Sequence, residues 1–386
     1  MNQSKIQAFF TLLGSAIFGD VLSNNEIASI KDDELLSMTA IAKKHDLSHL
    51  FALGLDQNKL LKKCQAVSQK DIIKAVYRYE QLNYELGNLC KSLEEAKIDF
   101  MPLKGSVIRK YYPEPWMRTS CDIDILVHES DLEKATEYLV ENLGYAYDRK
   151  GAHDVSLFLE KRLHLELHYT LIGDGVAKSS CEVLKDVWKS AFLRIGKKHW
   201  YEMTDEMFYF YHVAHMAKHF EEGGCGIRPF IDLCILDNIE NKDQNKRNEL
   251  LQQGDLLRFA EIARLLSRVW FDDAAHTETT KQMEQYILRG GVYGTKENRI
   301  AVQQQKKGGR IKYALSKIFI PYDVIKFHYP ILQKHKWLTP FMEVRRWLKL
   351  IFCGHAKRTL NELKYNQTIS ADKADVTKNF LENIGL

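Results

Sequence analysis

The chain has 386 residues, which suits two to three domains and a large apolar core that needs no disulfide or metal staple. Apolar residues make up 45% and charged residues 27%, with only 21 glycines and 7 prolines, which excludes disordered, collagen-like and low-complexity proteins. The formal charge of +4 is unevenly spread, because residues 301–360 hold thirteen Lys and Arg against Asp323 and Glu343. This asymmetry indicates an anionic partner for the C-terminal part.

The cysteines and the N-terminal apolar run bear on the cellular compartment. The 7 cysteines show no C-x-x-C spacing, as is typical of a reduced, cytoplasmic protein. Residues 8–19 are interrupted by polar residues and glycine, and residues 1–7 hold a single lysine, so an amphipathic first helix is expected in place of a signal peptide. No stretch approaches the roughly 20 apolar residues of a membrane span. We therefore expect a cytoplasmic protein without a transmembrane segment.

The N-terminal region, residues 1–95, predicts helices, since its apolar residues recur at three- and four-residue spacing. Residues 98–101 form a short apolar run that predicts a strand ended by Pro102. The motif Lys104-Gly105-Ser106 then opens a short helix that stops before Pro113. The chain therefore passes from helices into a strand, turn and helix unit.

A mixed α/β core is expected over residues 96–172. A β-branched run at 123–127 predicts its second strand. Ser130 and Glu133 have the spacing of a capping box, and the helix that they start ends at Gly144. Two further strands are expected at 154–160 and 163–169, joined by a tight turn at Lys161-Arg162.

The remainder of the chain predicts helices. In residues 173–300 we expect helices at 206–220, 230–240 and 245–290, with a glycine-rich loop at 223–226. Residues 306–310, with two glycines, indicate a linker or mobile loop at the start of a basic, aromatic helical region, 301–386. The fold class is therefore α+β, with a small mixed sheet and its helices embedded between mainly helical N- and C-terminal regions.

Asp122 and Asp124 carry the first chemical signal. They lie two residues apart at the start of a strand, so both carboxylates project from the same face while Ile123, Ile125 and Val127 enter the core. Paired carboxylates attract hard divalent cations such as Mg²⁺, which commonly share their ligands with substrate phosphates.

Two neighbouring segments add to this pair. Gly105 and Ser106 stand at a strand-to-helix turn, where free N–H groups favour phosphate. The strand at 163–169 alternates, which puts Glu166 on the polar face with His164 and His168 and lets it reach the aspartates if the two strands are neighbours. Three carboxylates and a phosphate-holding turn suit nucleotidyl transfer with two metal ions.

These residues resemble a known family. The segments P-L-K-G-S at 102–106, R-T-S-C-D-I-D-I-L-V at 118–127 and L-E-L-H at 165–168 resemble the uncharacterised bacterial nucleotidyltransferases of the DNA polymerase β superfamily, and a weaker resemblance recurs at 226–233 and 319–350. The resemblance implies a polymerase β type fold, two Mg²⁺ ions, an NTP donor and release of pyrophosphate. The sequence departs from the usual pattern at Lys104, where a glycine is common, and at Glu166, where many members have Asp.

Several further residues are candidates for the nucleotide site. Lys104 and Arg118 would neutralise the triphosphate, or would form structural salt bridges to the same aspartates. Arg228 and Asp232 would line the nucleotide or acceptor pocket, or would form an i, i+4 ion pair on their helix. His168, on the Glu166 face, is expected to contact phosphate or to position Glu166.

Two histidine patterns point to alternatives. His164, Glu166 and His168 on one strand are compatible with a zinc site, although a fourth ligand is missing. His215 and His219 lie four residues apart on a predicted helix, but no H-E-x-x-H motif is present and their apolar neighbours favour core packing.

The basic, aromatic C-terminal region leaves three interpretations open. Its arginines and lysines, interleaved with Trp337, Phe341 and Trp347, would bind RNA, lie on an anionic membrane surface, or cover the active site as a basic lid. We prefer the lid.

The sequence thus predicts a Mg²⁺-dependent transferase that moves an NMP from an NTP to a hydroxyl or phosphate of an unknown acceptor, which would be a small molecule, a peptide, a protein or RNA. Asp122, Asp124 and Glu166 would hold the metal ions. The alternative is a non-catalytic nucleotide-binding scaffold whose basic tail binds nucleic acid or an anionic membrane.

Overall fold

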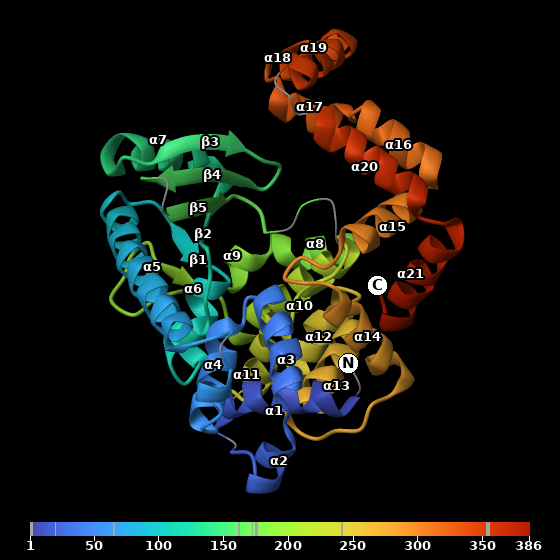
Figure 1. Ribbon diagram of the computed structural model, residues 1–386. Helices are drawn as coiled ribbons and strands as arrows, with labels where there is room; N and C mark the ends of the chain where they lie inside the picture. The colour runs from blue at the N-terminus through green and yellow to red at the C-terminus, as the bar shows by residue number, and fades with distance from the viewer. Residues whose placement is uncertain are drawn as a thin grey trace.

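The structure, a computed structural model, has a five-stranded mixed sheet surrounded by helices (Figure 1). It describes residues 3–19, 21–64, 66–160, 163–171, 173, 177–240, 242–352 and 356–386. Far more residues lie in helices than in strands, and the sheet lies between helical regions of the chain. The expected α+β class is therefore confirmed.

The sheet has the strand order β1-β2-β5-β4-β3. The strands are β1 (Phe100–Pro102), β2 (Asp122–Val127), β3 (Ala146–Lys150), β4 (Asp154–Leu159) and β5 (Leu163–His168). The central pair, β2 and β5, is parallel, whereas the other neighbours are antiparallel. Because β2 and β5 run side by side in the same direction, Asp122 and His164 lie together where these two strands begin.

One face of the sheet is covered by the long helix α5 (Gln69–Glu95) and by α7 (Leu132–Leu143). Ile123, Ile125 and Val127 of β2 point into this apolar layer, each at most 1% exposed. Strand alternation then sends the acidic residues of β2 to the opposite face. On that face Leu126 joins a second, larger core.

The larger core joins segments that are far apart in the sequence. It contains residues of the N-terminal helices, of the helices after the sheet and of the C-terminal helix. The N-terminal helices are α1 (Gln3–Phe18), α2 (Asn24–Ser29), α3 (Asp32–Lys44) and α4 (Ser48–Gln57). Close packing of α1 on α4 depends on Gly54, because a Cβ there would lie 1.9 Å from the Leu12 carbonyl oxygen.

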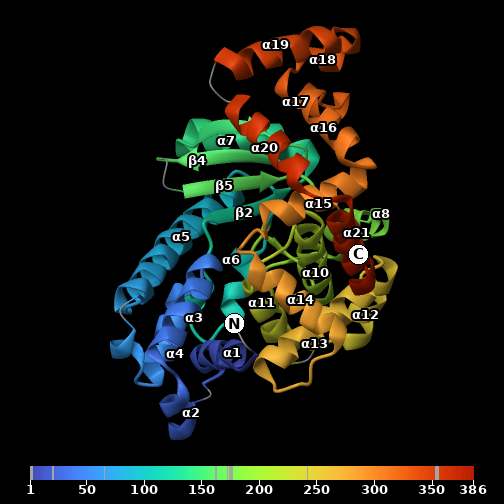
Figure 2. The same ribbon diagram turned by 45° about the vertical axis from the view of Figure 1, so that its right-hand side comes forward.

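Helices also dominate the chain after the sheet. They are α8 (Lys178–Lys185), α9 (Val187–Ser190), α10 (Asp205–Glu221), α11 (Arg228–Asp237), α12 (Gln244–Gln253), α13 (Leu257–Phe271) and α14 (Glu278–Arg289), with a small hairpin of β6 (Phe192–Leu193) and β7 (Tyr201–Glu202) between α9 and α10. The core-facing residues of α10, among them Phe210 and Phe220, are fully buried. This helix therefore stands inside the body, between the sheet and the other helices (Figure 2).

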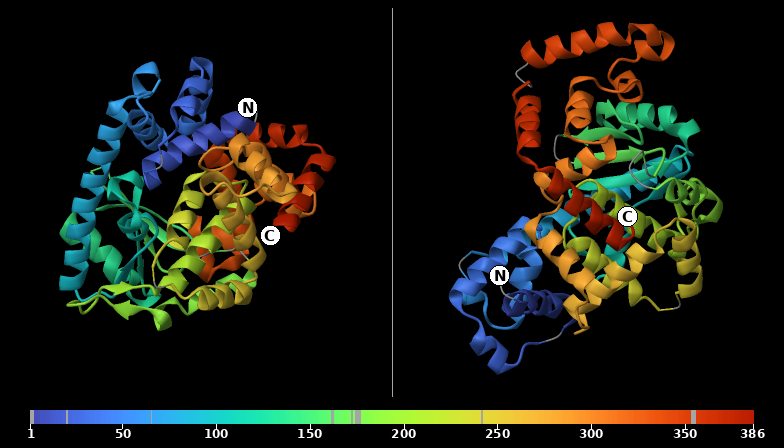
Figure 3. Two further views of the ribbon diagram at one scale, coloured as in Figure 1. Left: turned by 90° about the horizontal axis from the view of Figure 1, so that it is seen from below. Right: turned by 90° about the vertical axis from the view of Figure 1, so that its right-hand side faces the viewer.

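The C-terminal helices form an arm that stands out from the body (Figures 1, 2 and 3). They are α15 (Lys296–Lys307), α16 (Arg310–Ile318), α17 (Tyr322–His328), α18 (Ile331–Lys334), α19 (Thr339–Phe352), α20 (Ala356–Thr368) and α21 (Ala371–Ile384). The last helix returns to the body, since Phe380, Leu381 and Ile384 join the larger core. Among the described residues no helix is both long and apolar enough to span a bilayer.

Two local expectations need correction, and a third is confirmed. Residues 306–310 are not a linker: α15 ends at Gly308 in the left-handed conformation (φ 77°), and α16 begins at Arg310. The capping box is wrong, because a 3-10 turn at Glu129–Asp131 precedes α7 and no side chain caps that helix. The predicted end at Gly144 is confirmed by its left-handed φ of 72°.

Strand β3 was not predicted from the sequence. All five of its residues, Ala-Tyr-Asp-Arg-Lys, are exposed at the edge of the sheet, so neither apolar alternation nor burial marks them as a strand. The expected strands at 154–160 and 163–169 correspond to β4 and β5. The predicted turn at Lys161-Arg162 lies outside the described residues.

Candidate active site

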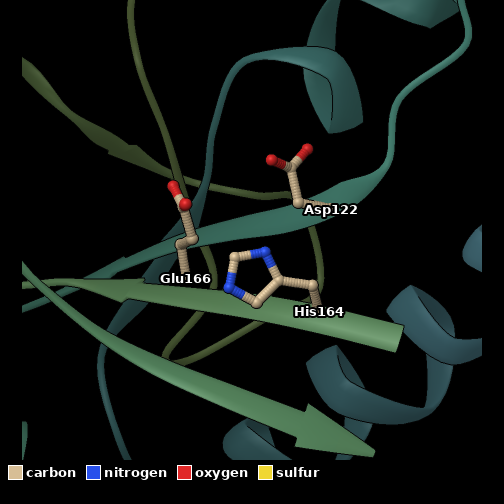
Figure 4. A group of neighbouring side chains, drawn as sticks. All are labelled: Asp122, His164 and Glu166. Carbon is tan, nitrogen blue, oxygen red and sulfur yellow. The ribbon is translucent and has the colours of Figure 1, made fainter. Parts of the chain in front are cut away.

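The pairing of β2 with β5 brings the three predicted acids together. The register places Asp122 opposite His164 and Asp124 opposite Glu166. Because partners in register share a face, all three carboxylates project from the sheet on the side away from α5 and α7. Figure 4 shows the carboxyl groups of Asp122 and Glu166 on the same side of their strands, with the His164 ring between them.

Lys104 and His168 contact two of these carboxylates. The Lys104 ammonium lies 2.6 Å from Asp124 Oδ1 and 3.6 Å from Glu166 Oε2. His168 donates from Nε2 to Asp124 Oδ1 at 2.8 Å, and the same nitrogen lies 3.4 Å from Glu166 Oε2. Asp124 is only 3% exposed, so these interactions take place largely out of water.

The charges of this cluster are strongly coupled. Burial raises the pKa of Asp124, but Lys104 and the hydrogen bond from His168 outweigh burial and hold that pKa well below its usual value. The hydrogen bond from His168 likewise lowers the pKa of Glu166. Asp122 lacks such support, and burial together with the nearby Asp124 carboxylate raises its pKa. At Asp122 burial and the neighbouring carboxylate therefore disfavour the charged form in spite of the nearby Lys104 charge.

Two groups of side chains have the spacing of a metal site. They are Asp122 with His164 and Glu166, and Asp124 with Glu166 and His168, and in each group the ligand atoms lie within 4.8 Å of one another. The Lys104 ammonium already shows that the space beside Asp124 and Glu166 suits a cation. A set rich in carboxylate oxygen fits a hard divalent ion. Each group needs an aspartate of β2, so the described residues do not offer the zinc set of His164, Glu166 and His168 on one strand.

The turn that carries Lys104 is packed directly against β2 and the segment leading into it. The Leu103 N–H donates to the Asp124 carbonyl at 3.0 Å, and Lys104 has a positive φ of 45°. A Cβ on Gly105 would lie 3.2 Å from the Cβ of Ser120, so only glycine fits there without a shift. The turn is thereby held beside the acids, with Lys104 directed at Asp124.

Arg109, which the sequence analysis passed over, ties this turn to the segment before β2. Its Nε donates to the Gly105 carbonyl at 2.7 Å and its Nη2 donates to Ser120 Oγ at 2.8 Å. Burial lowers the pKa of this guanidinium to about 10. The Ser106 N–H donates to the Leu103 carbonyl at 3.1 Å, which closes the turn, so this N–H is not one of the free N–H groups that the sequence analysis expected.

Arg118 and Asp232 form a buried ion pair that connects the segment before β2 to helix α11. Arg118 Nε lies 2.7 Å from Asp232 Oδ1 and 3.0 Å from Oδ2, and the Tyr112 hydroxyl donates to Oδ1 at 2.6 Å. Asp232 is fully buried, whereas Arg228 turns outward to Asp46. Arg118 therefore does not pair with Asp122 or Asp124, and Arg228 does not pair with Asp232; their contact with nucleotide stays a prediction.

A polar row on α10 faces the acidic cluster, and it was expected to be core packing. Tyr211, His215 and His219 lie four residues apart, and the rings of the two histidines are 4.5 Å apart. Burial raises the pKa of Tyr211, and the charges of Lys104 and Asp124 also act on it. The Tyr211 hydroxyl has no hydrogen-bond partner among the described residues.

The histidines of this row are neutral. Burial lowers the pKa of His219 to about 4 and that of His215 well below its usual value. None of the row joins a potential metal group among the described residues. The signal that would have marked the row is the four-residue spacing of Tyr211, His215 and His219, which places the three side chains on one side of the helix.

Comparison with known proteins identifies the family. A family model described as uncharacterised nucleotidyltransferase matches residues 31–272, more than half of the chain. The chain belongs to this nucleotidyltransferase family. The matched region contains the sheet, all three acids, the Lys104 turn and helices α10 and α11. Family membership implies a transferase that uses an NTP. No protein of curated function and no solved structure matches the chain.

Proposed function

We propose that this nucleotidyltransferase has a polymerase β type core and moves an NMP from an NTP to a hydroxyl or phosphate of an acceptor, with Mg²⁺ as the metal. The observation that carries the proposal is the convergence of Asp122, Asp124 and Glu166 from two parallel strands. Family membership supports the reaction class, and the acidic cluster supports a divalent cation.

The carboxylates would hold the metal ions. Asp122 and Asp124 would contact both ions, and Glu166 one of them. Bound there, Mg²⁺ supplies electrostatic stabilisation to the attacking and leaving oxygens of an in-line displacement. Burial, together with the neighbouring Asp124 carboxylate, raises the pKa of Asp122, and a cation bound at these ligands would offset both effects.

The remaining residues would bind and orient the substrates. The acceptor oxygen attacks the α phosphorus, the bond from that phosphorus to the bridging oxygen breaks, and pyrophosphate leaves. Glu166 is ionised at neutral pH and would take the proton of an acceptor hydroxyl. Lys104, with Gly105 and Ser106, would neutralise and hold the β and γ phosphates, while His168 keeps Asp124 and Glu166 in place.

The test uses the four NTPs labelled at the α phosphate, with Mg²⁺ and a cell lysate as the source of acceptors. We expect transfer of label into protein, RNA or a metabolite, and a loss of at least about a hundredfold in Asp124→Asn, since an essential charge is removed. Asp99→Asn is the matched control, because Asp99 is a half-buried acid that pairs with His199 outside the cluster. Unchanged labelling by a folded Asp124→Asn variant would refute the proposal.

Measurements of nucleotide and Mn²⁺ binding distinguish the proposed enzyme from the alternative, a non-catalytic scaffold. That alternative draws on the ion pair of Lys104 with Asp124, which already provides a cation at the site. A scaffold would bind nucleotide without forming pyrophosphate. It would bind no Mn²⁺ at the acidic cluster, so Asp122→Asn would not change its Mn²⁺ binding. The proposed enzyme is expected to bind Mn²⁺, a spectroscopic substitute for Mg²⁺, and to lose that binding in Asp122→Asn.

A further inference from the structure

The outer face of helix α19, in the arm, is apolar although it is open to solvent. We define this face by Phe341, Val344, Leu348, Ile351 and Phe352, which are 63%, 61%, 50%, 59% and 84% exposed. Their spacing of three and four residues places them on one side of the helix. A surface helix normally turns such a side toward the core, so this orientation requires an explanation.

Polar contacts fix the orientation of α19. The carboxylate of Glu343, only 8% exposed, accepts from the Ile320 N–H at 2.7 Å and from Arg346 Nε at 2.9 Å. Arg346 Nη2 and Trp347 Nε1 both donate to the Ile318 carbonyl, at 2.6 and 2.9 Å. These bonds satisfy backbone groups at the end of α16. The polar side of α19 is therefore used inside the arm, and the apolar side is left outside.

Basic side chains flank the outer face. Arg345 and Lys349 are exposed and lie next to it on the helical wheel, whereas Glu343, the one acid in the α19 sequence, is turned inward and paired. Just before the helix, Lys336 and Trp337 are also exposed, Trp337 at 69%. The outer face is thus an apolar stripe with Arg345 and Lys349 beside it and Trp337 near one end. Such a stripe complements a surface whose interior is apolar and whose outer layer is anionic.

The place and length of α19 suit a helix that lies on a membrane. It stands at the end of the arm, beyond the sheet and the helical body (Figures 1 and 3). With 14 residues it is about 21 Å long, shorter than the hydrocarbon core of about 30 Å, so it can lie in a bilayer surface but cannot cross it.

We propose that the outer face of α19, with Arg345 and Lys349, docks the protein onto an anionic lipid bilayer, with the helix lying in the plane of the headgroups. Three of the five side chains of the face, Val344, Leu348 and Ile351, are aliphatic and do not stack on bases as an RNA site requires. A symmetric dimer through this face would bring two sets of Arg345 and Lys349 together with no exposed acid of α19 to pair them. The proposal is independent of the proposed transferase chemistry, because the arm lies outside residues 31–272.

Sedimentation of the full chain with vesicles tests the proposal. We expect binding to vesicles of phosphatidylcholine with phosphatidylglycerol, weak binding to phosphatidylcholine alone, and weakening as salt is raised. Ile351→Glu is expected to abolish binding. Its matched control is Ile73→Glu on α5, where the isoleucine is 64% exposed, and this variant is expected to bind as the unmodified chain does.

A second pair of variants isolates the charges. Arg345→Gln with Lys349→Gln should weaken binding to anionic vesicles at least about tenfold, since each basic residue near the surface contributes about 1 kcal/mol. Lys70→Gln with Lys74→Gln, two exposed lysines four residues apart on α5, is the matched control and should bind normally.

Several results would overturn the membrane proposal. The first is failure of the chain to sediment with anionic vesicles at low salt. The second is unchanged binding of the Ile351→Glu variant, and the third is equal binding to anionic and neutral vesicles. Binding to RNA, or a dimer in solution, that Ile351→Glu abolishes while vesicles are not bound would assign the face to those partners instead.

Discussion

Replacing Asp232 by asparagine should destabilise the protein strongly, because it leaves the Arg118 guanidinium buried without a counter-charge. Asp232 is fully buried and accepts both from Arg118 and from the Tyr112 hydroxyl. The cost of breaking a buried ion pair by removing one partner is about 3–5 kcal/mol. Asparagine keeps the shape and part of the hydrogen bonding, so we expect a loss near the lower end, about 3 kcal/mol, in the free energy of unfolding.

The chain contains a matched control for this substitution. Asp46 also pairs with an arginine, Arg228, but it lies at the surface and its side chain is 59% exposed. Exposed pairs contribute about 0–1 kcal/mol, so Asp46→Asn should cost less than about 1 kcal/mol. Asparagine also tolerates the positive φ of 56° at this position. The same chemical change is thus made in a buried pair and in an exposed pair.

Urea denaturation at neutral pH, followed by far-UV circular dichroism, measures both variants. The double variant Arg118→Met with Asp232→Leu should recover most of the loss, because it removes both buried charges together. Equal effects of Asp232→Asn and Asp46→Asn would refute the reasoning, since burial would then not control the cost. A double variant as unstable as the single one would show that packing around Asp232, and not the unpaired Arg118 charge, sets the loss.

Two further predictions concern stability. Burial lowers the pKa of His45 and His49 from 6.5 to about 4, so each binds a proton more readily in the unfolded chain, and stability falls as pH drops from 6.5 toward 4. Each histidine should lower the free energy of unfolding by about 2 kcal/mol between pH 7 and pH 5, as measured by urea titrations. The variant His45→Leu should lose the part of this pH dependence that His45 contributes. An unchanged dependence of stability on pH in this variant would contradict the prediction. Gly54→Ala should cost at least about 2 kcal/mol, because its Cβ would meet the Leu12 carbonyl at 1.9 Å, whereas Gly87→Ala, with open space around it, should cost nothing in the same assay.

The sequence determined the local parts of the candidate site. The alternation of β2 and β5 is a property of the extended backbone, so it already placed Asp122 and Asp124 on one face and Glu166 on the polar face of its own strand. The turn at Lys104 to Ser106 could also be read locally, from a proline that ends a strand and a glycine that opens a helix.

Only the tertiary structure decided which of these parts meet. That β2 lies beside β5 in parallel, that Arg118 pairs with Asp232 and not with the aspartates of β2, and that Tyr211 faces the acids are all contacts between residues far apart in the sequence. Such contacts follow from how whole elements pack, and a local pattern carries no information about its distant partner. The same reason applies to α19, whose sequence shows an apolar side and a polar side, but whose polar bonds to the end of α16 leave the apolar side facing outward.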